Sequence, residues 1–259
     1  MPARLVVFSA QRAMIRHSML QRLMTPEGMI IAAVTLSLTL FIFRPRKPRT
    51  TSIDGIPGAN TRLVKKFRES MVINYERWHE GIGYDLSLLR SATPEECAAI
   101  ETILLREPIT DWRPVEALHA LHTTQCLEKL KSTFASSTDH EVKLAITQYA
   151  GEIFSPEERS AAIISALKEA PLIKGLTAAL RQIPQFHPPE IIAQLLDSAL
   201  HREGESAIHC AAMVLFLHGK ADSIFDNAHM SFLTRFCLKA PGARAAAYEE
   251  LCQRIGVTQ

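Results

Sequence analysis

One apolar run constrains the fold of this chain more than any other feature. The sixteen residues Gly28–Phe43 carry no charge and no proline, and the basic, proline-containing segment Arg44–Arg49 follows them directly. As a helix the run covers about 24 Å at 1.5 Å per residue, less than the roughly 30 Å hydrocarbon core of a bilayer. Pro26 in a first turn and a snorkelling Arg44 lengthen the span. We therefore expect a transmembrane anchor over residues 26–45.

The flanks of the run separate three interpretations. A buried core helix rarely carries such a basic, proline-rich end, and a cleaved signal peptide needs a small-residue cleavage site, which is missing after Phe43. A retained signal anchor fits both ends. A mitochondrial transit peptide stays open as an alternative, because residues 1–26 contain arginine and no acidic residue. Residues 1–25 are otherwise a basic N-terminal segment.

Basic residues near the run predict its orientation. The cluster after the run is the heavier and closer one, so the positive-inside rule places the C-terminal part in the cytoplasm, at the inner membrane in a bacterium. The residues that flank the anchor on this side are Arg44, Arg46, Lys47 and Arg49.

Charge is unevenly distributed along the chain. Residues 1–59 hold eight of the 29 Lys+Arg and two of the 27 Asp+Glu, which leaves 21 basic and 25 acidic groups in residues 60–259. The basic cluster near the run therefore indicates membrane topology and attraction to anionic lipid. The rest has no basic excess to neutralise phosphates, and no nucleic-acid partner is expected.

The five cysteines are widely spaced and form no CxxC pair and no zinc spacing. Free thiols in a reducing compartment explain them best, so no disulfides are expected, which agrees with the cytoplasmic orientation. They are Cys97, Cys126, Cys210, Cys237 and Cys252.

Downstream of the anchor the sequence predicts helices. Residues 46–60 are rich in proline, glycine and short polar residues and are expected to form a linker. From Thr61 onward apolar residues recur at helical spacing, without a convincing strand alternation. Helix starts are expected at a Thr93–Glu96 capping box and at prolines that follow Ser155 and Pro188, with Asp111 and Thr123 as further caps. The fold class is therefore all-α.

Two stretches suggest an internal repeat. Residues 139–153 and 203–219 align with Val142 and Ala207 at matching places 65 positions apart, two steps of about 32, and residues 174–180 form a weaker copy between them. Residues 110–256 thus resemble the HEAT-like (PBS-lyase-type) helical-repeat family. The resemblance implies an α-solenoid of stacked helix pairs over 111–259, after a helical N-terminal cap over 61–110. A non-repeating helical bundle is the alternative.

One aromatic-rich block, residues 73–85, is the least repeat-like part of the chain. It is interpreted either as a ligand or peptide pocket, with aromatic walls and a few polar groups, or as a cap that covers the first repeat. An Asp-Trp-Arg triplet further on could add an Arg–carboxylate contact beside an indole. The candidate binding residues are Tyr75, Glu76, Trp78, His79, Tyr84, Asp85, Asp111, Trp112 and Arg113.

Metal and enzyme motifs are not found. A HEAT-like iron hydroxylase family uses four His-Glu pairs, whereas this chain has two, His79-Glu80 and His140-Glu141. The other histidines follow no HExxH or HxH pattern, and GxSxG, phosphate-loop and dinucleotide motifs are missing. No catalytic residue, metal or cofactor is therefore expected. The sequence favours a membrane-anchored scaffold that binds an unknown protein partner, and the alternative is a helical enzyme or small-ligand-binding protein that uses Tyr75–Asp85.

Overall fold

A computed structural model describes residues 55–238 and 242–257, and every regular element in these ranges is a helix. The all-α prediction is confirmed for these residues. None of their helices is both long and apolar enough to cross a bilayer. The expected anchor over 26–45, its basic flank and the first part of the linker lie outside the described residues.

Three short elements come first, namely α3 (Arg62–Met71), α4 (Tyr75–His79) and the 3₁₀ turn η1 (Leu86–Ser91). Helix pairs follow. The pairs are α5 (Pro94–Arg106) with α6 (Trp112–Leu121), α7 (Thr124–Ser136) with α8 (His140–Tyr149), α9 (Pro156–Glu169) with α10 (Thr177–Gln182), and α11 (Pro189–His201) with α12 (Glu205–Leu217).

Short turns connect several of these helices, and the chain ends in a smaller group. The turns are η2 (Gly151–Ile153), η3 (Leu172–Leu176) and η4 (Ile183–Gln185). The last group consists of η5 (Asn227–His229), α13 (Met230–Leu233), η6 (Thr234–Cys237) and α14 (Ala243–Ile255).

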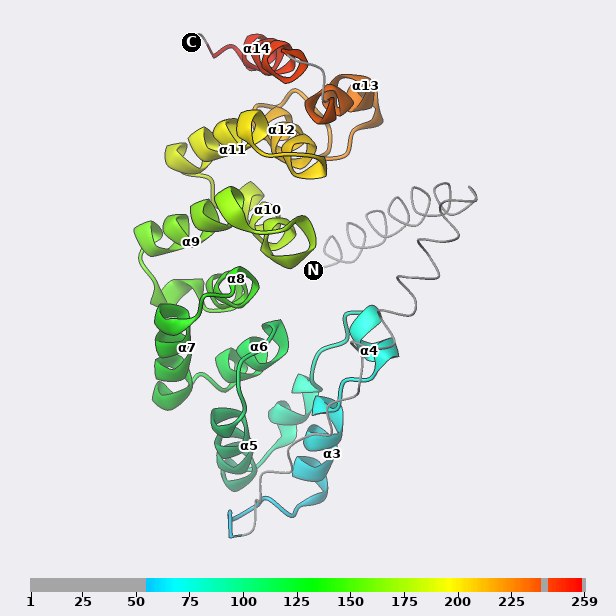
Figure 1. Ribbon diagram of the computed structural model, residues 1–259. Coiled ribbons are helices and arrows are strands. Elements are labelled where there is room, and N and C mark those ends of the chain that lie inside the picture. Colours follow the sequence, from blue (N-terminus) through cyan, green and yellow to red (C-terminus); the bar gives the residue numbers. More distant parts are fainter. Residues whose placement is uncertain (1–54, 239–241, 258–259) are drawn as a thin grey trace. The chain divides into compact units, whose positions relative to one another are not determined.

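The helix pairs follow one another at nearly constant spacing. Their first helices begin at Pro94, Thr124, Pro156 and Pro189, at steps of 30, 32 and 33 residues. The two helices of each pair pack together, α6 packs on α8 and α8 on α10, and α5 packs on α7 and α9 on α11. Figure 1 shows α7, α9 and α11 on one side of this succession, with α8, α10 and α12 on the other. The pairing begins at α5, upstream of the expected boundary at residue 111.

Helix α8 lies between two clusters of buried apolar side chains. Its Val142, Ala145 and Ile146 pack with the buried residues of α3 and α5–α7. Its Leu144 packs with the buried residues of α9–α14. The helix therefore buries side chains on both flanks, which explains why Leu144, Ala145 and Ile146 are apolar at three consecutive positions. This position makes α8 the physical link between the two halves of the described region.

Basic side chains link one helix pair to the next by hydrogen bonds to the carbonyls at helix ends. Lys129 of α7 donates to the carbonyl of Leu104 at 2.9 Å, at the end of α5. Arg202, which follows α11, donates to the carbonyls of Leu167 and Ala170 at 2.8 and 2.6 Å, at the end of α9. The last carbonyls of a helix have no partner within it, and the C-terminal dipole favours a cation. These two contacts therefore stabilise both the helix ends and the junctions between pairs.

Candidate functional site

Three of the nine candidate binding residues form an aromatic stack on α4. The ring of Tyr75 lies 6.2 Å from that of Trp78 and 5.8 Å from that of His79, measured between centroids. Tyr75 and Trp78 are 61% and 48% exposed, and His79 Nδ1 lies 3.2 Å from the carboxylate of Glu80. Glu76 is exposed on the same helix. This stack is a surface feature.

A second group surrounds Arg113, which is only 3% exposed. Its Nε donates to the carbonyl of Ile82 at 2.8 Å, and one terminal nitrogen donates to Asp111 Oδ2 at 2.9 Å. The other oxygen of Asp111 accepts the backbone N–H of Arg113, so that Asp111 caps α6. The ring of Tyr84 packs edge-on against Phe67. Burial, with a further contribution from Asp111, raises the pKa of Tyr84 well above its usual range.

Trp112 connects the turn before η1 to α8. A Cβ added at Gly83 would lie 3.1 Å from the indole, so the glycine permits the close approach. On its other side the indole stacks on Tyr149, with ring centroids 6.2 Å apart and planes 14° from parallel. Asp85 caps η1 through Ser87. These contacts fit a packing junction that holds residues 61–91 on α6.

The candidate residues thus fall into two groups with different surroundings. In the part of the chain that the structure describes, Arg113 bonds to Ile82 and Asp111, while Asp85 bonds to Ser87. The polar atoms of Arg113 are directed into the junction, where they satisfy backbone and capping groups. Arg113 thus lies at this junction, whereas Trp78 of α4 lies at the surface. The choice between a pocket and a cap for residues 73–85 stays a prediction.

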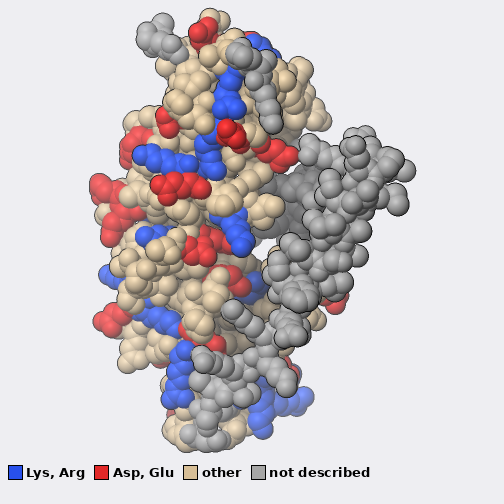
Figure 2. Space-filling view, viewed as in Figure 1, with Lys and Arg blue, Asp and Glu red and all other residues tan. Residues whose placement is uncertain are grey.

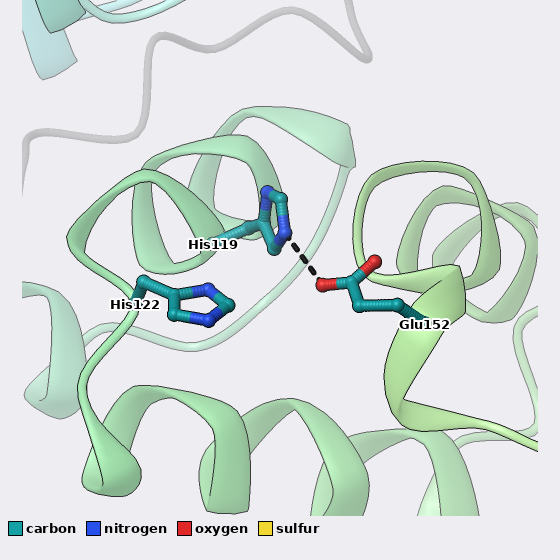
Figure 3. Close-up of side chains that lie close together, drawn as sticks. All are labelled: His119, His122 and Glu152. Atoms are coloured by element: carbon teal, nitrogen blue, oxygen red, sulfur yellow. Dashed lines mark hydrogen bonds and ion pairs between the residues drawn. The ribbon is translucent and has the colours of Figure 1, made fainter.

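A different cluster joins His119, His122 and Glu152. One ligand atom from each lies within 4.8 Å of the others, the single such His/Cys/Asp/Glu group among the described residues. His119 Nε2 lies 2.8 Å from Glu152 Oε1, and the two imidazoles meet edge-on with centroids 5.6 Å apart. Figure 3 shows both rings and the carboxylate facing one another. These three are the side chains that could hold a metal.

Local structure positions each member of the cluster. His119 lies in the last turn of α6, and His122 ends that helix in the left-handed conformation, with φ of 53°. Glu152 lies in η2, directly after α8. Burial by itself raises the pKa of Glu152, but its backbone hydrogen bond and the contact with His119 outweigh this and lower the pKa. The sequence signal for this cluster is the i, i+3 spacing of His119 and His122, which matches neither the HExxH nor the HxH pattern.

Another surface feature lies at the start of α8 and in η3, the turn that leads into the second helix α10. We define the second-helix face by Glu141 of α8 and by Ile173 and Lys174 of η3. Ile173 is 87% exposed. Burial raises the pKa of Glu141, Asp139 adds to this effect, and Lys174 opposes it. In Figure 2, basic and acidic side chains are interspersed along the visible surface, an arrangement that favours specific polar contacts over long-range attraction of one sign.

Comparison with known proteins adds no family to this description. No protein-family model matches the sequence, and searches of curated proteins and of solved structures returned no match. The likeness of residues 110–256 to HEAT repeats therefore stays a prediction from sequence.

Proposed function

We propose that this protein is a membrane-anchored helical-repeat scaffold, whose HEAT-like α-solenoid binds a cytoplasmic protein partner through the second-helix face. The observation that carries the proposal is the regular succession of helix pairs, whose first helices begin 30, 32 and 33 residues apart. Among the first helices α5 packs on α7 and α9 on α11, and among the second helices α6 packs on α8 and α8 on α10. Packing between successive helix pairs is typical of repeat proteins, in which each unit buries its apolar face on the next, and it supports the proposal.

Stacked repeats supply long surfaces for binding, because equivalent helices of neighbouring units lie side by side. In this chain the face over α8 and η3 presents an exposed isoleucine beside groups of both charges. An apolar anchor surrounded by polar groups is typical of protein–protein interfaces, where the anchor supplies affinity and the charges supply specificity. The mixed charge also favours a protein over a nucleic acid as the partner.

The sequence before residue 46 supports location at a membrane. The run Gly28–Phe43 and its basic flank have the pattern of a retained signal anchor with the C-terminal part in the cytoplasm. A proline- and glycine-containing linker over 46–60 would then let the repeats reach partners near the bilayer. The proposal therefore combines a fixed location with a mobile binding domain.

Affinity purification of the full chain from detergent extract tests the proposal with a single substitution. Ile173→Glu places a charge at the apolar anchor, and we expect recovery of the partner to fall about 10-fold, the effect of losing roughly 1.4 kcal/mol of binding free energy. Because Ile173 is 87% exposed, the fold should change little. Recovery is measured by quantitative mass spectrometry against the wild-type chain.

Ser132→Glu is the matched control, because it adds the same charge at an exposed position of the first helix α7. It should leave recovery of the partner unchanged. If no protein is enriched by the wild-type chain, or if both substitutions reduce recovery equally, the second-helix face is not the binding surface.

A further inference from the structure

Two imidazoles and one carboxylate meet at the junction between the first two helix pairs. They come from the last turn of α6, from the residue that ends α6, and from η2 after α8. We propose that His119, His122 and Glu152 bind one divalent transition-metal ion of the Zn²⁺ class, so that the ion links the first helix pair to the second.

The distances suit such an ion after small side-chain rotations. Around tetrahedral zinc, with bonds of about 2.0–2.1 Å, neighbouring ligand atoms lie about 3.3–3.5 Å apart. Here His119 Nε2 and Glu152 Oε1 are 2.8 Å apart, and the three ligand atoms lie within 4.8 Å of one another. Rotation about side-chain bonds can bring the three ligand atoms to the separations of a zinc site without movement of the helices.

The ligand types narrow the class of ion. Imidazole nitrogen with carboxylate oxygen suits zinc and its neighbours in the first transition series, whereas calcium and magnesium prefer oxygen ligands alone. Two His and one Glu are the protein ligands of a zinc site that keeps one coordination position open. Glu152 is 54% exposed at its side chain and His122 is exposed, so water can occupy the open position.

The backbone of His122 contributes to the position of its ring in the cluster. His122 is the single non-glycine residue with positive φ in the described ranges. Glycine is the usual residue for a helix that ends in this conformation, and histidine is among the few other residues that are enriched there. The left-handed turn places the His122 ring beside that of His119. The residue that ends α6 therefore carries the side chain that completes the cluster.

Titration of the purified full chain with Zn²⁺ tests the site. We expect one zinc per chain to bind in competition with a chelating dye, and we expect His119→Ala, His122→Gly and Glu152→Gln each to weaken this binding at least about 100-fold. His122→Gly suits the left-handed backbone, so its folding is expected to be intact. Zinc should also raise the unfolding temperature of the wild-type chain by about 5–10 °C at 100 times its Kd, and the variants should lose this rise.

His201→Ala is the matched control. His201 is an exposed helical histidine whose Nδ1 lies 2.9 Å from the Asp197 carboxylate, as His119 lies beside Glu152. It should leave zinc affinity unchanged within two-fold. Zinc affinity that persists in all three cluster variants would overturn the proposal, and so would an equal fall in His201→Ala. A folded His122→Gly chain with unaltered zinc affinity would also overturn it.

Discussion

Arg113→Ala is expected to lower the free energy of unfolding by about 3 kcal/mol. The guanidinium is 3% exposed and bonds to the Ile82 carbonyl and to Asp111. Its removal leaves the Ile82 carbonyl without this donor and the carboxylate without its cation, and breaking a buried pair by removing one partner typically costs about 3–5 kcal/mol. The lower end of this range is expected for Arg113→Ala because the Asp111 side chain is 33% exposed. Urea unfolding of the full chain, followed by circular dichroism, measures the change.

Arg235→Ala is the control for this prediction. Arg235 forms an ion pair with Glu250, but both side chains are about one-third exposed, and such surface pairs contribute roughly 0–1 kcal/mol. A loss in Arg113→Ala no larger than in Arg235→Ala would mean that residues 82–84 are not held on α6 by this arginine.

Gly175→Ala is expected to destabilise the protein by about 3 kcal/mol or more. Gly175 has φ of 117°, outside the regions that L-residues ordinarily adopt. An added Cβ would lie 2.8 Å from the Cβ of Ala170 and 3.0 Å from that of His140. Backbone strain of about 1–3 kcal/mol and overpacking of similar size therefore act together. Thermal and urea unfolding of the full chain report the loss.

Gly256→Ala separates the two causes. Gly256 also has positive φ, at 74°, but no heavy atom lies within 4 Å of the position its Cβ would take. Its substitution should cost only about 1–2 kcal/mol, the expense of the left-handed conformation. Equal losses of unfolding free energy in Gly175→Ala and Gly256→Ala would show that η3 does not pack tightly on α8.

Helix starts were predictable from sequence because local contacts determine them. Thr93, Asp111, Thr123 and Ser155 are all N-caps that accept a backbone N–H, as their patterns predict. The capping box of Thr93 with Glu96 forms in full. A cap and its partner are two or three residues apart, so the short-range sequence contains the information that the structure uses.

Features that depend on contacts between residues distant in the sequence could not be predicted from it in the same way. The weak copy at 174–180 contains a kink at Lys174 and Gly175, where the backbone approaches His140 of α8 closely. The buried Arg113 donates its Nε–H to a carbonyl 31 residues earlier, and Glu152 meets a histidine 33 residues earlier. Composition and periodicity carry no information on such pairings, since they arise only once neighbouring helix pairs have packed.

Site-specific photocrosslinking in intact membranes tests the scaffold proposal most directly. A photoreactive residue is placed at Ile173 in η3 or at Gln148, an exposed residue of α8, and for comparison at Ser132 or Glu128, exposed residues of α7. After irradiation, adducts are identified by mass spectrometry. We predict that one partner protein crosslinks from Ile173 and Gln148 and not from α7. No adduct from the second-helix positions, or equal adducts from both sets, would contradict the proposal.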